Sequence, residues 1–155
     1  MLRKNIKAKT DRAGGRFAIV ASKYNAKYVD SMLRACQGAL KKAGAEKVEV
    51  ARVPGAFEIP VAAARLSRAE PPYAAIICLG VVIQGETQHA RLISEGLTHA
   101  LAQLQTAREI PIIHEVLLLE NQEQAKVRCL SREHNRGAEA AQTAVEMAAL
   151  MARLS

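Results

Sequence analysis

The sequence contains very few aromatic residues. Only 3% of its 155 residues are Phe, Tyr or Trp, and Trp is absent altogether. The formal net charge of +7 favours anionic partners, such as phosphorylated metabolites, nucleic acid or an acidic protein. Proteins that bind single-stranded nucleic acid without sequence preference stack the bases on aromatic side chains, and this chain has few to offer. The composition therefore argues against a nucleic-acid-binding module.

Long apolar runs are missing as well. No run is long enough to span a membrane, and no signal-peptide pattern opens the chain, so we expect a cytoplasmic protein without a membrane segment. The cysteines Cys36, Cys78 and Cys129 lie on separate predicted elements and have no paired spacing. This pattern indicates reduced thiols in or near the core.

Signals for metals and nucleotide cofactors are also absent. The four histidines do not show a spacing that recurs in zinc sites. A Walker or dinucleotide fingerprint would need a glycine-rich loop after a strand, whereas Gly14-Gly15 precedes the first predicted strand. The sequence therefore predicts neither a metal nor an organic cofactor.

What the sequence does contain is a regular alternation of strand and helix patterns. Half of the residues are hydrophobic, which suits one globular domain over residues 16–155 behind a basic N-terminal arm of residues 1–15. Apolar runs predict strands at 17–21, 48–53, 74–79 and 110–118, the second of them nearer an edge. Helical spacing predicts helices between and after them, with Asn25 and Asn121 as N-caps and a last helix at 138–154. This order predicts an α/β fold with a four-stranded parallel sheet and helices on both faces.

The stretch from Gly80 to His89 is predicted to be a turn between the third strand and a helix. Its glycines let backbone approach a ligand, and the helix start offers free N–H groups to an anion. Thr87 adds a hydroxyl, and His89 can transfer a proton near neutral pH. A strand–turn–helix without a ligand would also need a glycine and a cap, so the pattern alone leaves both interpretations open.

Other candidate residues follow the remaining strands. Ligands of parallel sheets bind beyond the carboxyl ends of the strands, and those ends carry Tyr24, residues 56–58 and His114-Glu115. Tyr24 and Phe57 are two of only five aromatic residues, and together they would suit a flat ring. The alternative is that Phe57 packs on a helix start and Tyr24 covers a loop.

A basic segment at 126–137 lies far from these strand ends along the chain. Its arginines could capture a phosphate group, since an arginine–anion hydrogen bond contributes about 1.5–3 kcal/mol. The alternative is a solvated helix face. The sequence pattern leaves both open.

Taken together, these segments resemble the lumazine synthase family. The resemblance runs from about Arg16 to the C-terminal helix and is carried by Tyr24-Asn25, residues 53–60 (VPGAFEIP), residues 79–89, Glu123-Gln124-Ala125 with Arg128, residues 135–141 and residues 146–148. It implies a flavodoxin-like three-layer sandwich. It also implies the condensation of 5-amino-6-(ribitylamino)uracil with 3,4-dihydroxy-2-butanone 4-phosphate to 6,7-dimethyl-8-ribityllumazine in riboflavin biosynthesis, without metal or cofactor.

The resemblance further implies roles for individual residues. Tyr24 would stack on the pyrimidine ring, with Val81, Val82 and Ile83 along the ring, and Ala56, Phe57 and Glu58 would line the ribityl chain. Gly85, Glu86 and Thr87 would help to hold the phosphate, and His89 would transfer protons. A neighbouring subunit would contribute His114 and Arg128, the latter binding phosphate with Arg136 close by.

The sequence departs from the family pattern at the fourth strand. His114 stands where Phe is frequent and Glu115 where a small residue is common, so we expect added polarity and charge beside the ring, with altered affinity and pH dependence. Tyr24 replaces Phe or Trp, and Gln84 replaces a frequent Arg.

The resemblance also bears on assembly. Family members form pentamers, and the absence of an insertion between Arg128 and Gly137 favours shells of sixty subunits; riboflavin synthase is an expected partner. A shell or scaffold protein whose site has drifted is the alternative function, and the intact Glu58, His89 and Arg128 count against it.

Overall fold

A computed structural model describes residues 15–86 and 88–154 of the chain. Nearly all of the predicted N-terminal arm, and Thr87 of the predicted ligand-binding turn, lie outside the described residues. The division into an arm of residues 1–15 and a domain of residues 16–155 therefore stays a prediction. Within the described part of the chain, no helix is long and apolar enough to cross a lipid bilayer.

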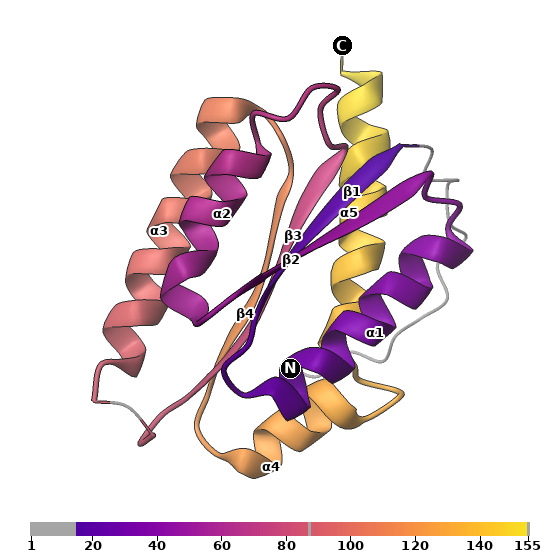
Figure 1. The fold of residues 1–155 in the computed structure, drawn as a ribbon. Coiled ribbons are helices and arrows are strands. Elements are labelled where there is room, and N and C mark those ends of the chain that lie inside the picture. Colours follow the sequence, from indigo (N-terminus) through magenta and orange to yellow (C-terminus); the bar gives the residue numbers. More distant parts are fainter. Residues whose placement is uncertain (1–14, 87, 155) are drawn as a thin grey trace.

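The centre of the fold is a four-stranded parallel sheet with the strand order β2-β1-β3-β4 (Figure 1). Its strands are β1 (Arg16–Ser22), β2 (Lys47–Val53), β3 (Ala75–Ile83) and β4 (Ile112–Leu119). Every residue of β3 is buried, as expected of a central strand that is covered on both faces. β2 has a single buried residue and lies at an edge, as its less apolar sequence predicted.

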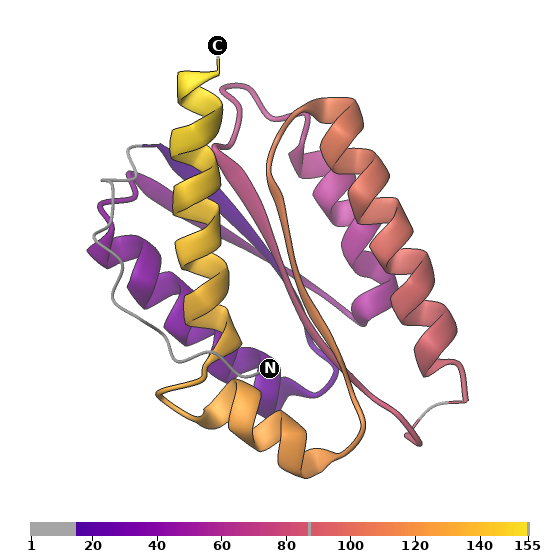
Figure 2. The same ribbon diagram turned by 180° about the vertical axis from the view of Figure 1, so that it is seen from behind.

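Helices cover both faces of the sheet and produce three layers (Figures 1 and 2). One face is covered by α1 (Ala26–Lys42) and α5 (Arg136–Arg153), and the other by α2 (Ile59–Leu66) and α3 (Ala90–Arg108). The 3-10 helix η1 (Ala56–Glu58) precedes α2, while α4 (Gln122–Ala125) and the π-helical η2 (Lys126–Leu130) connect β4 to α5. The predicted flavodoxin-like three-layer architecture is confirmed.

β3 is longer than the sequence predicted. It ends at Ile83, so Gly80 lies inside the strand and the prediction of a turn from Gly80 onward is wrong. A Cβ atom at Gly80 would lie 3.1 Å from Val116 Cγ1 and 3.2 Å from Ser22 Oγ. The glycine is needed there because side chains from both neighbouring strands crowd its position, and only residues 84–89 form the connection to α3.

Asparagine residues stand at the starts of three helices, although not all in the predicted way. Asn121 Oδ1 accepts a hydrogen bond from Gln124 N at 2.9 Å, as predicted for an N-cap. Asn135 Oδ1 accepts from Gly137 N at 2.8 Å, so α5 begins at Arg136 rather than after Gly137. The predicted start of the last helix at residue 138 is therefore two residues too late, because Asn135 ends the preceding loop as the cap.

Asn25 occupies the predicted N-cap position of α1 but makes no side-chain cap bond. Its backbone is left-handed, with φ 57° and ψ 43°, a conformation that Asn adopts more readily than most residues. The side chain reaches across to the sheet instead, and Nδ2 donates to the carbonyl oxygen of Val81 at 2.8 Å. The predicted capping mechanism is thus wrong.

The three cysteines are buried and unpaired, which confirms the prediction of core thiols. Cys36 and Cys129 belong to the cluster beneath α1 and α5, and Cys78 belongs to the cluster beneath α2 and α3. Burial raises the pKa of each thiol to about 12, so the thiols stay protonated at neutral pH.

Candidate functional site

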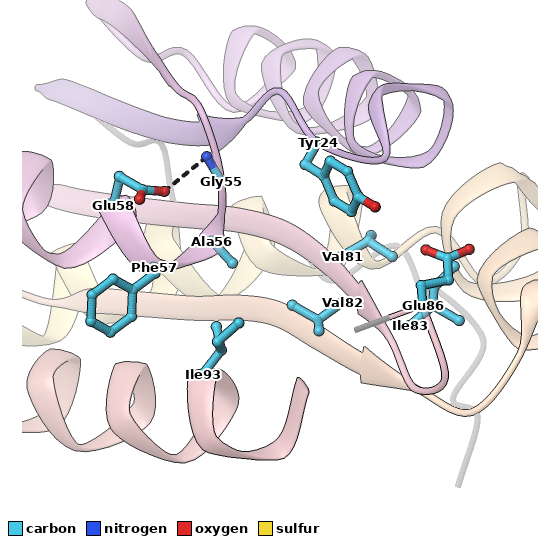
Figure 3. Close-up of a pocket in the computed structure, with 10 residues that line it drawn as sticks. All are labelled: Tyr24, Gly55, Ala56, Phe57, Glu58, Val81, Val82, Ile83, Glu86 and Ile93. Atoms are coloured by element: carbon cyan, nitrogen blue, oxygen red, sulfur yellow. Dashed lines mark hydrogen bonds between the residues drawn. The ribbon is translucent and has the colours of Figure 1, made fainter. Parts of the chain in front are cut away.

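A cavity of about 270 Å³ lies at the carboxyl ends of β1, β2 and β3 (Figure 3). It brings together the residues after β1, the turn after β2 and the end of β3, because parallel strands place their carboxyl ends at one edge of the sheet. Its lining consists of Tyr24, Gly55, Ala56, Phe57, Glu58, Val81, Val82, Ile83, Glu86 and Ile93. Segments far apart in the sequence thus form one site.

Two aromatic side chains form exposed walls of this cavity. Tyr24 is 60% exposed and Phe57 is 67% exposed, so neither ring fills the core. Figure 3 shows Phe57 at one end of the site, near Ile93, and Tyr24 at the other end, near Val81; Val81 and Val82 belong to an apolar floor. Exposed aromatic faces beside an apolar floor suit a flat, partly apolar ring. This geometry favours the ring-binding interpretation over mere coverage of a loop and a helix start.

Backbone hydrogen bonds hold Tyr24 at the cavity. Lys23 N donates to the carbonyl oxygen of Val53 at 2.7 Å, and Tyr24 N donates to that of Pro54 at 3.1 Å. These bonds continue the pairing of β1 with β2 beyond the ends of both strands. The bond from Asn25 to Val81 then ties the same loop to β3, so all three central segments fix the position of the tyrosine.

Glu58 closes the turn that follows β2. Its Oε2 atom accepts a hydrogen bond from Gly55 N at 3.0 Å, drawn as a dashed line in Figure 3. A Cβ atom at Gly55 would lie 3.0 Å from that oxygen, so the glycine leaves room for the carboxylate. The other carboxylate oxygen of this exposed residue can accept hydrogen bonds from a polar ligand chain in the cavity.

The connection after β3 carries Glu86 into the cavity. Gly85 has φ 88°, the left-handed conformation that favours glycine, and this turns the chain at the end of the strand. Glu86 Oε1 accepts from Gln122 Nε2 at 2.8 Å, and Gln122 Oε1 accepts from the Tyr28 hydroxyl. The carboxylate is thereby linked to both α4 and α1. His89 stands at the N-cap position of α3, is exposed, and is not among the described lining residues.

His114 is held as a neutral ring. The Thr98 hydroxyl donates to the Ser94 carbonyl oxygen at 2.7 Å, so its oxygen accepts from His114 Nε2–H at 2.8 Å. His114 Nδ1 in turn accepts from Val116 N at 3.2 Å. Both ring nitrogens are thus satisfied in the neutral tautomer, and burial lowers the pKa of the imidazole.

Glu115 faces away from His114, because successive side chains of a strand point to opposite faces. It lies on the side of α5, where its carboxylate pairs with Arg136. His114 and Glu115 therefore lie on opposite faces of the sheet, and the expectation that they add polarity and charge beside the ring stays a prediction.

Arg128 and Arg136 line a second cavity, of about 450 Å³, along the edge strand β4. The rest of its described lining is Leu117, Leu118, Leu119, Glu120 and Gln124, and it shares no residue with the first cavity. The two predicted phosphate-binding arginines thus come together, supplied by η2 and by the first turn of α5. Within one chain, they are not part of the cavity that contains Tyr24 and Phe57.

Comparison with known proteins identifies the family. The family model for 6,7-dimethyl-8-ribityllumazine synthase matches residues 14–152. The chain is 38% identical over 143 residues to 6,7-dimethyl-8-ribityllumazine synthase of Salinibacter ruber, an alignment that covers 91% of each protein. It is 41% identical over 138 residues to the protein of the same name from Kineococcus radiotolerans, covering 88% of this chain and 84% of the relative. The chain belongs to the lumazine synthase family. It is therefore assigned to the enzymes of riboflavin biosynthesis.

The residues expected from the lumazine synthase resemblance divide into three groups in the structure. The first cavity holds Tyr24, Ala56, Phe57, Glu58, Val81, Val82, Ile83 and Glu86. Outside it lie Gly85, His89, His114, Arg128 and Arg136, and Thr87 is outside the described residues. The roles of all of them in catalysis and binding stay predictions. Among the described residues, no three side chains come together as metal ligands.

The sequence analysis missed two lining residues of the first cavity, Gly55 and Ile93, and one ion pair of this lumazine synthase structure. Ile93 completes the apolar wall of the first cavity, and its place one turn into a helix with apolar spacing was the available signal. The pairing of Arg136 with Glu115 was also missed, because the two residues are separated by 21 positions and no local pattern links them.

Proposed function

We propose that the protein is an active lumazine synthase that condenses 5-amino-6-(ribitylamino)uracil with 3,4-dihydroxy-2-butanone 4-phosphate, without metal or cofactor. Membership of the family supports the reaction class. The observation that carries the proposal is the first cavity, in which two exposed aromatic rings flank an apolar floor beside the carboxylates of Glu58 and Glu86. A flat ring with a polyol chain needs this combination of surfaces.

The chemistry requires positioning and proton transfer more than a strong nucleophile. An amino group of the pyrimidine adds to the ketone and one water leaves, and phosphate is then eliminated. The second amino group closes the ring onto the remaining carbonyl group with loss of a second water, which completes the lumazine. Each step moves protons between nitrogen, carbon and oxygen atoms, which a histidine near neutral pH can mediate. In the proposal, His89 at the start of α3 performs this transfer.

We further propose that each active site is shared between two subunits. Arg128 and Arg136 line a cavity separate from the one with Tyr24 and Phe57, so a neighbouring subunit must supply the arginines if both cavities serve one substrate pair. Exposed apolar side chains on the adjacent elements η1, α2 and α3, namely Phe57, Val61 and Leu92, support association of subunits. A pentamer, and a shell of pentamers, is the proposed assembly.

The first test is lumazine formation, followed by absorbance with both substrates and no added metal. Arg128→Ala removes a charge-assisted hydrogen bond to phosphate, so we expect kcat/KM for the phosphorylated substrate to fall roughly 10- to 100-fold. Arg132→Ala is the matched control, because Arg132 is exposed, carries the same charge and does not line the described cavity. Equal losses in both variants would contradict a specific role for Arg128.

Mixed assemblies test the sharing of the site. His89→Ala and Arg128→Ala subunits are unfolded, mixed in equal amounts and reassembled. A shared site takes His89 from one subunit and Arg128 from its neighbour. Each of these residues is intact in half of the subunits, so about a quarter of the interfaces regain both. Recovery of about that share of wild-type activity is the expected result, and no recovery would contradict a shared site. A well-folded, assembled wild type that forms no lumazine would favour the alternative, a scaffold protein with a drifted site.

A further inference from the structure

Arg136 is held between two carboxylates at the wall of the second cavity. Its Nε and Nη2 atoms lie 3.2 and 3.3 Å from the two carboxylate oxygens of Glu115, and Nη1 lies 3.2 Å from Glu139 Oε2. The side chain of Arg136 is 28% exposed, so it is reached from the cavity. An anion that enters the cavity must therefore compete with both carboxylates for this guanidinium.

The two carboxylates differ in their contact with solvent. Glu115 comes from β4 and is only 7% exposed, whereas the side chain of Glu139 on α5 is 28% exposed. Burial raises the pKa of the Glu115 carboxyl to about 7, although Arg136 acts in the opposite direction. If Arg136 turns away towards an anion, the buried carboxylate loses the cation that offsets its desolvation.

Among the described residues, the other titratable groups shown to interact with Glu115 are two thiols and one carboxyl, and none of them is a cation. Cys36 on α1 and Cys129 on η2 are close enough to interact electrostatically with Glu115, but both thiols stay protonated because burial raises their pKa to about 12. On α5, the charged groups that face Glu115 are Arg136 and Glu139. The protonation of Glu115 therefore depends on Arg136.

The formal charge of the cavity changes with this proton. Arg128 and Arg136 contribute two positive charges, and ionised Glu115, Glu139 and the lining residue Glu120 contribute three negative charges. The five groups then carry one net negative charge and attract a dianion weakly. A proton on Glu115 makes them neutral in sum and leaves the guanidinium available for a second partner.

We propose that Glu115 is a proton-linked counter-ion for Arg136: a dianion that binds in the cavity with Arg128 displaces Glu115 from the guanidinium, and the Glu115 carboxyl takes up one proton from solvent. This role rests on the proposed function in one respect, namely that the natural dianion is the phosphate group of the substrate. Glu115 acts through Arg136 and is a positioning residue. Phosphate binding by this site is consequently coupled to pH.

The test uses sulfate as the probe, since sulfate keeps its charge of −2 across the pH range of the experiment, whereas phosphate does not. Titration calorimetry with the assembled wild-type protein at pH 6 to 8.5 measures its affinity. With one proton taken up per anion, the affinity falls with rising pH and approaches a loss of about tenfold per pH unit above pH 7. Titrations in two buffers of different ionisation enthalpy measure the proton uptake directly and need no variant.

Three variants locate the effect. Glu115→Gln keeps the size of the side chain but cannot ionise, so its sulfate affinity should be higher at pH 8 and independent of pH within about twofold. Glu139→Gln is the matched control: it removes the more exposed carboxylate of the same arginine and should keep the wild-type slope. Arg128→Ala should weaken sulfate binding at every pH.

Several outcomes would overturn the proposal. For the wild type, they are a sulfate affinity that does not change with pH and a proton uptake near zero above pH 7. For the variants, they are a sulfate affinity of Glu115→Gln that still falls with pH as in the wild type, and unchanged sulfate binding in Arg128→Ala. Sulfate binding is measured without turnover, so its result is independent of the lumazine assay. A protein that shows the linked proton but makes no lumazine would refute the proposed function and retain Glu115 as a proton-linked counter-ion for another dianion.

Discussion

Helices α1 and α5 lie in very close contact at Gly137, and this contact predicts a severe effect of adding a single methyl group. Gly137 lies in the first turn of α5 and is buried against α1. A Cβ atom at this position would lie 2.0 Å from the carbonyl oxygen of Met32 and 2.6 Å from its carbonyl carbon and its Cα. These are backbone atoms in the middle of α1, which cannot rotate away as a flexible side chain would. Gly137→Ala therefore requires the two helices to separate by more than about 1 Å, in a core that is otherwise closely packed.

Two opposing effects determine how much Gly137→Ala lowers the free energy of unfolding. Overpacking a core typically costs 1–3 kcal/mol, and backbone contacts this short belong at or above the upper end. Alanine recovers about 1 kcal/mol of helix propensity relative to glycine, which offsets a part of that cost. We expect Gly137→Ala to destabilise the protein by roughly 3 kcal/mol. For a chain of this length, this corresponds to a fall in Tm of about 6–12 °C.

The assay is thermal unfolding at a fixed protein concentration, because assembly makes Tm depend on concentration. Gly38→Ala is the matched control. Gly38 is also a helical glycine, in α1, but a Cβ atom added there would meet nothing within 4 Å. That substitution should raise the stability by about 0.5–1 kcal/mol. A Gly137→Ala protein as stable as the wild type, or equal losses for both substitutions, would refute the reasoning.

Two further predictions concern pH and the loop that carries Tyr24. Burial raises the pKa of Glu115 from 4.5 to about 7. The protonated carboxyl therefore stabilises the folded state below about pH 4.5, and this stabilisation is lost as the pH rises through 7. In chemical denaturation, the free energy of unfolding of the wild type relative to Glu115→Gln should fall by up to roughly 3 kcal/mol between pH 4.5 and 7.5. A constant difference between the two proteins over this range would contradict the raised pKa. Asn25→Gly removes the bond to Val81 and should cost about 1 kcal/mol, whereas Asn25→Ala must also adopt the left-handed backbone and should cost about 2 kcal/mol. Equal melting temperatures for the two variants would show that the backbone conformation is not the reason for asparagine at this position.

The sequence by itself determined the architecture and much of the first cavity. Short apolar runs separated by helical patterns can bury their surfaces only as a covered parallel sheet, and this gave the order of elements and the edge position of β2. Parallel strands also bring their carboxyl ends to one edge. The convergence of Tyr24, Phe57 and Val82 therefore followed from their places at strand ends, without knowledge of the turns between them.

The tertiary structure decided which neighbours each of these residues has. A glycine in a strand and a glycine in a turn look alike in sequence, and only the pairing with Val116 of β4 shows that Gly80 belongs to β3. In the same way, His114 is held neutral because burial lowers the pKa of its imidazole and Nδ1 accepts from Val116 N, and Glu115 is paired because α5 begins with Arg136 beside it. Local patterns record spacing along the chain, whereas charge, protonation and steric fit depend on groups brought together across the sheet. Those groups exist as neighbours only once the layers have packed.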